Sequence, residues 1–160
     1  MKKNLFLAAI LSTMTMAAHA EDQFQYAGFS AGINSHTTSA SKSNSDANGV
    51  LTFGEGLRLT DAQALAGELQ LVSLNGHMIP AAQMVYFTSG SDMSLDHVPV
   101  TLALHSGVGA RMGLTTGVDL MFPLTMTIIP TASIRTGFTL FQNKVDGARG
   151  LFNVGLYNSF

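Results

Sequence analysis

The chain has 160 residues, a formal net charge of −2 and no cysteine, and only 11% of its residues are charged. The acidic balance gives no reason to expect a nucleic-acid partner, and the lack of cysteine excludes disulfides and thiolate chemistry. Ordinary soluble domains carry about 25% charged residues, so this chain has few charges with which to cover a water-facing surface.

The N-terminal region has the pattern of a secretory signal peptide. A basic start at residues 2–3 is followed by an apolar stretch over residues 5–18 and an A-x-A cleavage site that ends at Ala20. The apolar stretch is short for the about 20 residues of a membrane helix. We therefore predict that residues 1–20 are a cleaved signal peptide and that residues 21–160 form one exported domain.

The remainder of the chain alternates between oily and small or polar residues. No apolar run of about 18 residues follows the signal, so a membrane helix is not expected. Period-two alternation is typical of strands whose two faces meet different surroundings. In chain order we predict eight strands, at residues 24–34, 50–59, 63–74, 78–88, 98–112, 117–124, 127–141 and 151–160.

The connections differ in length and composition. Residues 36–49 form a long loop rich in Ser, Thr and Asn, whereas residues 60–62 form a short turn. Asn75-Gly76 is a tight-turn signal. Most of the predicted strands are near the 9–11 residues with which a tilted strand crosses a membrane.

The last ten residues resemble a known strand type. The oily face consists of Phe152, Val154, Leu156 and Phe160, and the other face of Asn153, Gly155, Tyr157 and Ser159. A terminal Phe after alternating hydrophobic residues resembles the closing strand of small eight-stranded bacterial outer-membrane β-barrels, the opacity and OmpA-transmembrane-domain class. Asn158 departs from that pattern, because the family usually has an apolar residue there.

The resemblance implies a fold, a location and partners. The expected fold is all-β, an antiparallel up-and-down transmembrane β-barrel with an even number of strands and both termini on the periplasmic side. The expected location is the outer membrane, with its lipid and lipopolysaccharide as neighbours. The resemblance also implies insertion by the barrel-assembly machinery, with Phe152, Val154, Leu156 and Phe160 as the assembly signal.

Charged residues within the strands fall mostly on the face opposite the oily one, which is the interior of a barrel. Buried charges must pair, because an unpaired ion in a low dielectric is costly. If a turn centres near Thr115, Arg111 lies across from Asp119. If the next turn centres near Thr125 or Met126, Asp119 is also diagonal to Arg135. We therefore predict interior ion pairs among Arg58, Glu68, Arg111, Asp119 and Arg135.

The second strand contributes two of the charges. Arg58 reaches Glu68 only if the turn between the second and third strands centres close to Gln63. Glu55 points outward by strict counting, and only a bulge at a neighbouring glycine would turn it inward. The interior charges could line a pore or could form a plug that closes the barrel. We favour the plug, because an interior of about eight strands is just wide enough for side chains to fill.

Two other classes of function stay open. The first is a lipid A-modifying barrel enzyme, an acyl hydrolase or acyltransferase, which would need His105 or His36 beside a Ser and an acid. Adjacent strand residues point to opposite faces, so His105 cannot easily activate Ser106. The second is a soluble periplasmic lipocalin-like or β-sandwich binding protein, which would turn its oily face inward. The scattered histidines have no metal-ligand spacing, and we expect no metal and no cofactor.

The favoured hypothesis is a monomeric, non-catalytic barrel with a structural or surface-interaction role. The interacting parts would be the external loops, expected at residues 35–49, 75–77, 113–117 and 142–148. Aromatic residues such as Tyr26 and Tyr86 would form girdles at the membrane interfaces.

Overall fold

The computed structural model describes residues 23–36, 45–74, 76–95, 98–124, 132–143 and 147–160. The predicted signal peptide and its cleavage site lie outside the described residues. No helix among the described residues is long and apolar enough to cross a membrane.

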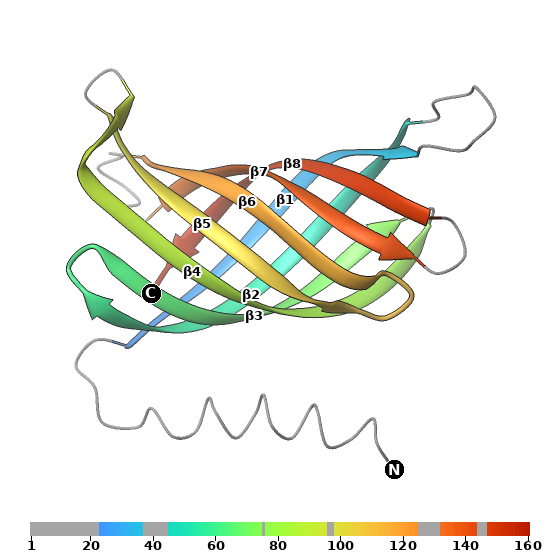
Figure 1. The fold of residues 1–160 in the computed structure, drawn as a ribbon, viewed down its shortest axis with the longest axis horizontal. Coiled ribbons are helices and arrows are strands. Elements are labelled where there is room, and N and C mark those ends of the chain that lie inside the picture. Colours follow the sequence, from blue (N-terminus) through green and yellow to red (C-terminus); the bar gives the residue numbers. More distant parts are fainter. Residues whose placement is uncertain (1–22, 37–44, 75, 96–97, 125–131, 144–146) are drawn as a thin grey trace, which may run out of the picture.

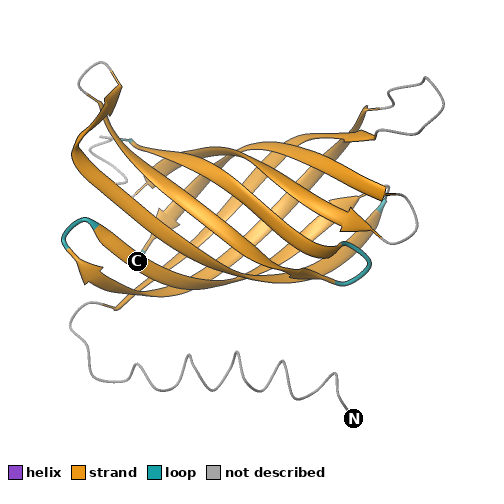
Figure 2. Cartoon of the chain, viewed as in Figure 1, coloured by secondary structure: helices purple, strands orange, loops and turns teal. Residues whose placement is uncertain are grey.

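The described residues form eight antiparallel strands that close into a barrel, which confirms the predicted fold class (Figures 1 and 2). The strands are β1 (Gln23–His36), β2 (Ser45–Thr60), β3 (Gln63–Leu74), β4 (His77–Leu95), β5 (Val98–Gly109), β6 (Gly113–Pro123), β7 (Ala132–Asn143) and β8 (Gly147–Ser159). Each strand pairs with its neighbours in sequence, and β1 also pairs with β8, so Tyr26 lies across from Ser159. Closure leaves no strand edge along this sheet.

The turn between β5 and β6 differs from the prediction. It occupies residues 110–112, and Gly109 pairs with Gly113 across it. Arg111 (φ 66°) and Gly113 (φ 74°) adopt the left-handed backbone that reverses the chain here. The predicted loop at 113–117 is therefore wrong, since these residues belong to β6. The alternation of side chains did not reveal where the chain reverses. Residues 109 and 113, on either side of the turn, both have the parity that was predicted to face inward, so the pattern runs on without a break.

The outer surface of the barrel is apolar. The large hydrophobic side chains exposed there come from every strand: Phe29, Ile33, Leu51, Phe53, Leu59, Leu65, Leu69, Leu71, Met78, Met84, Leu104, Val108, Leu114, Val118, Leu120, Phe138, Leu140, Phe152, Val154 and Leu156. We call this set the outer belt. A soluble protein rarely exposes so large a continuous apolar surface. The alternative of a soluble binder required the oily face to lie inside, and the structure contradicts it.

The interior is filled in three layers along the barrel axis. Near the start of β1 and the end of β8 lies an aromatic layer, which includes Tyr26, Phe87 and Tyr157 together with Phe24. Near the β3–β4 and β5–β6 turns lies an apolar layer of Val50, Val72, Leu74, Ile79, Ala81, Met112, Phe141 and Leu151. The inward residues of β3 show the order directly, because Ala66 is followed by Glu68, Gln70 and then Val72. A polar layer thus lies between two apolar ones.

Candidate functional site in the barrel interior

The polar layer centres on Glu68, whose side chain is almost completely buried. Its Oε1 accepts a hydrogen bond from the hydroxyl of Tyr26 at 2.6 Å. Its Oε2 accepts from the amides of Gln83 at 2.6 Å and Gln70 at 3.1 Å. The guanidinium of Arg135 also donates to Oε1 and forms an ion pair with it. Four donors from four strands therefore satisfy one buried carboxylate, as burial of a charge requires.

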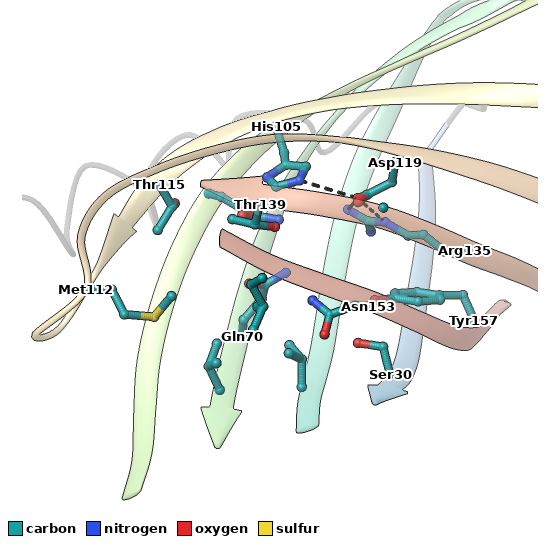
Figure 3. Close-up of a pocket in the computed structure, with 15 residues that line it drawn as sticks. Ser30, Gln70, His105, Met112, Thr115, Asp119, Arg135, Thr139, Asn153 and Tyr157 are labelled. Carbon is teal, nitrogen blue, oxygen red and sulfur yellow. Dashed lines mark hydrogen bonds and ion pairs between the residues drawn. The ribbon is translucent and has the colours of Figure 1, made fainter. Parts of the chain in front are cut away.

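Arg135 joins this carboxylate to a second one. Its Nε and Nη2 atoms both lie 2.6 Å from Oδ2 of Asp119 (Figure 3). The Cζ atom lies 5.0 Å from the centroid of the Tyr157 ring, a distance typical of a cation–π contact. An arginine side chain suits this position, because its planar fork can bind two carboxylates while its face packs on an aromatic ring. Arg135 is thus the bridge of the network.

His105 lies at the edge of the network. Its Nε2 is 3.5 Å from Oδ2 of Asp119, and neither ring nitrogen has a hydrogen-bond partner among the described residues. A cavity of ≈ 30 Å³ adjoins the ring and is also lined by Asn153 and Thr139 (Figure 3). Such a volume holds a water molecule or two, and the cavity offers the polar partners that buried water needs.

Glycines on the neighbouring strands make room for the large interior side chains. Directly across from Tyr26, His105, Asp119 and Tyr157 stand Gly54, Gly117, Gly137 and Gly28, in that order. A Cβ atom at any of these four glycines would overlap the side chain opposite. The interior of a small barrel is packed with side chains. Each of these four large side chains therefore fits because the residue directly across from it is a glycine, which has no side chain.

The structure brings together three of the five predicted interior charges. Glu68, Asp119 and Arg135 form the network described above, whereas Arg58 and Arg111 are exposed and lie outside it. Arg58 lies across from Ala64 and Glu68 lies across from Gly54, so the predicted pair between them is wrong. Arg111 does not face Asp119, because it sits in the β5–β6 turn, and Asp119 lies across from Ala103.

Glu55 stays on the outer face. Its register with β1 and β3 is continuous, and the one irregularity in the β2–β3 pairing lies between Arg58 and Thr60. No bulge at the neighbouring glycines turns Glu55 inward. The side chain instead lines a surface hollow that Gln25 and Phe160 also line.

Several members of the network were not predicted from the sequence. Tyr26 was expected at a membrane interface, but its side chain is buried and hydrogen-bonded to Glu68. Gln70 and Gln83 share the inward parity and are the only amide side chains that donate to Glu68 among the described residues. The sequence held a signal for both glutamines. They share the inward-facing parity of their strands, and a buried carboxylate needs hydrogen-bond donors.

The arrangement around His105 does not form a catalytic triad. Ser106 points to the outer face, where its hydroxyl donates to the backbone oxygen of Thr115 at 3.3 Å. His105 therefore has an acid nearby, but no hydroxyl of a described residue is hydrogen-bonded to its ring. The side chain of His36 lies outside what the structure describes. Within the described residues no group of three or more His, Cys, Asp or Glu could hold a metal ion.

Comparison with known proteins agrees with the fold. No protein-family model and no curated protein sequence matches the chain. Among solved structures, Neisserial surface protein A is similar with a TM-score of 0.51 and 14% identity, over 85% of this chain and 97% of that one. The chain has the fold of that small outer-membrane barrel. The attachment invasion locus protein Ail of Yersinia pestis, in complex with the heparin analogue sucrose octasulfate, matches with a TM-score of 0.49 and 12% identity, over 88% of this chain and all of that one.

Proposed function

We propose that this protein is a small, monomeric barrel of the Gram-negative outer membrane, without catalytic activity. The observation that carries the proposal is the outer belt, a set of large apolar side chains on all eight strands of a closed barrel. Only a lipid environment suits such a surface, because in water it would drive aggregation. The neighbours of the belt are then membrane lipid and, in the outer leaflet, lipopolysaccharide.

The orientation follows from the topology. The start of β1, the end of β8 and the β2–β3 turn lie at one end of the barrel, and the β3–β4 and β5–β6 turns lie at the other (Figure 1). We place the end with the start of β1 and the end of β8 in the periplasm, in keeping with other barrels of this kind. Among the described residues, Gly76 and the β5–β6 turn at residues 110–112 are then external, and a surface-interaction role would belong to the connections at that end.

The interior supports a structural barrel rather than a channel. A solute would have to displace the aromatic layer, the Glu68–Arg135–Asp119 network and the apolar layer in turn. The cavity beside His105, at ≈ 30 Å³, has room for only a water molecule or two. We therefore infer that the interior is closed by three stacked layers of side chains and not by ion pairs alone.

The test of location and fold is heat-modifiable gel migration. The protein is extracted with detergent from a membrane fraction and run with and without boiling. A closed barrel that resists the detergent is expected to migrate differently from the boiled chain. Recovery in the soluble fraction, with no shift on boiling, would refute the proposal. Reconstitution in a planar lipid bilayer tests the plug, and we expect no steady single-channel current.

A further inference from the structure

A hollow of ≈ 240 Å³ lies at the end of the barrel opposite the start of β1 and the end of β8. Its walls are the start of β4 and the β5–β6 turn, two segments that lie side by side (Figure 1). The residues that line it are His77, Met78, Ile79, Pro80, Ala110 and Arg111. Two of these can donate hydrogen bonds to an anion, and none carries a negative charge.

The backbone holds Arg111 toward this hollow. The amide of Ala110 donates to the backbone oxygen of Pro80 at 2.9 Å, which ties the turn to β4. Arg111 has a φ of 66°, a conformation that residues other than glycine seldom adopt because of steric strain. Its side chain is exposed and has no ion pair or hydrogen bond among the described residues, and the same holds for His77. A strained, unpartnered arginine beside a histidine is available to a ligand.

The same hollow borders the outer belt. Met78 lines the hollow and is 56% exposed, and Leu71, which lies across from Pro80 of the hollow, is 42% exposed. A ligand here would meet donors at the barrel rim and apolar side chains immediately below. This combination matches an amphiphile with an anionic head and hydrocarbon chains.

The hollow at the opposite end of the barrel lacks this charge pattern. The mouth near the start of β1 and the end of β8 has a volume of ≈ 300 Å³ and is lined by Arg58 and Asp61, one positive and one negative residue. It also opens into the barrel interior rather than onto the outer belt. Arg58 and Arg111 are both exposed, but of these two described arginines only Arg111 lines a hollow that has no acid and borders the outer belt.

We propose that the hollow between β4 and the β5–β6 turn binds the phosphate group of a phosphorylated membrane lipid. The Arg111 guanidinium donates to two phosphate oxygens, the His77 imidazole donates to one, and the acyl chains lie along Met78 and Leu71. This inference rests on the membrane placement proposed above and adds a specific lipid contact to it.

The test compares three variants of the full-length protein purified in detergent. Arg111→Asn removes the charge and suits the left-handed backbone, since asparagine tolerates it. Arg111→Lys keeps the charge but loses the planar fork. Arg58→Asn is the matched control, because it removes an exposed arginine from the other end. Native mass spectrometry records the adduct formed with added diphosphorylated lipid A.

We expect the wild type and Arg58→Asn to retain the lipid equally, and Arg111→Asn to bind it about tenfold more weakly, the effect of losing charge-assisted hydrogen bonds. Arg111→Lys should fall between them. Equal retention by Arg111→Asn would overturn the inference, as would equal retention of dephosphorylated lipid A. Displacement of the lipid by millimolar inorganic phosphate would overturn the lipid assignment in favour of a free-phosphate site.

Each failure has a separate readout. The heat-modifiable shift of every variant reports whether its barrel is folded. A wild-type protein that shows the shift but forms no adduct with diphosphorylated lipid A would refute only the lipid site. A protein without the shift would refute the membrane placement itself.

Discussion

Gly137 of β7 lies directly across from Asp119 of β6, and a Cβ atom on it would overlap the Asp119 carboxylate. Asp119 can lean over this glycine and reach Arg135, which is two positions away on the same strand as Gly137. The ion pair therefore depends on a residue that has no side chain. Glycine at this position is a requirement of space rather than of backbone conformation.

The first prediction follows from that lack of space. Gly137→Ala should destabilise the folded barrel by about 1–3 kcal/mol, because a methyl group would force the carboxylate away from Arg135. Gly49→Ala is the matched control, since a Cβ at Gly49 would meet its neighbours only at ordinary contact distances. Urea unfolding in lipid vesicles measures both. Equal stability of the two variants would show that the interior tolerates displacement of Asp119.

The second prediction concerns the bridge. Arg135→Met leaves the carboxylates of Glu68 and Asp119 buried without their cation, and should cost about 3–5 kcal/mol of unfolding free energy. Glu68→Gln should cost less, because it leaves one complete pair. The same urea titration distinguishes them.

A triple variant provides the control for the bridge. Arg135→Met combined with Glu68→Gln and Asp119→Asn removes all three charges together, so it should recover much of the loss. A triple variant as unstable as Arg135→Met alone would mean that packing of the arginine, rather than charge balance, explains the effect.

The third prediction tests the outer belt. Val118 lies in the middle of β6 and Leu114 near its end, and both side chains are exposed. In a membrane, Val118→Arg should cost about 2–4 kcal/mol, whereas Leu114→Arg near the interface should cost about 0–1 kcal/mol. Refolding into vesicles measures the difference. A small, equal cost at both positions is the result expected of a water-facing surface.

The fourth prediction concerns the terminal Phe160. Its amide donates to the backbone oxygen of Gln25 at 2.9 Å, and its backbone oxygen accepts from the Gln25 amide at 3.3 Å. Deleting it removes two hydrogen bonds worth about 0.5–1.5 kcal/mol each, a modest loss for refolding in vitro. If the closing strand is an assembly signal, the amount inserted in cells should fall much more steeply.

Phe29→Ala is the control for this experiment, since Phe29 is another exposed aromatic residue of the barrel surface. The amounts of each variant in the outer-membrane fraction are compared by immunoblot. A deletion that lowers insertion no more than Phe29→Ala does would remove Phe160 from the assembly signal.

The fold could be predicted because its physical signal is local. Each strand that spans a barrel must present one face to lipid and one to the interior, so residues such as Leu102 and Leu104 alternate with Ala103 and His105 in the sequence itself. The turn positions were harder to predict from the sequence. The chain reversal at Arg111 depends on its positive φ, which the sequence pattern did not indicate. A shift of a few residues in one turn changes every cross-strand partner beyond it.

The ion-pair network was only partly predictable for a different reason. The pair between Arg135 and Asp119 joins adjacent strands, and a hairpin register can suggest it. The pair between Arg135 and Glu68 joins β7 to β3 across the interior, which no adjacent register reveals. Its discovery needs the closed barrel, because closure brings side chains of distant strands to a common axis.

The pairing of β1 with β8 has a consequence for the order of folding. The two strands lie at opposite ends of the barrel sequence, yet Tyr26 and Ser159 are direct partners. Loop-closure entropy makes such a long-range contact slow to form. Until the last residues are made, β1 keeps an open edge that could recruit a strand from another chain. The barrel can close only when β8 is available to pair with β1, so we expect closure to be a late step of folding.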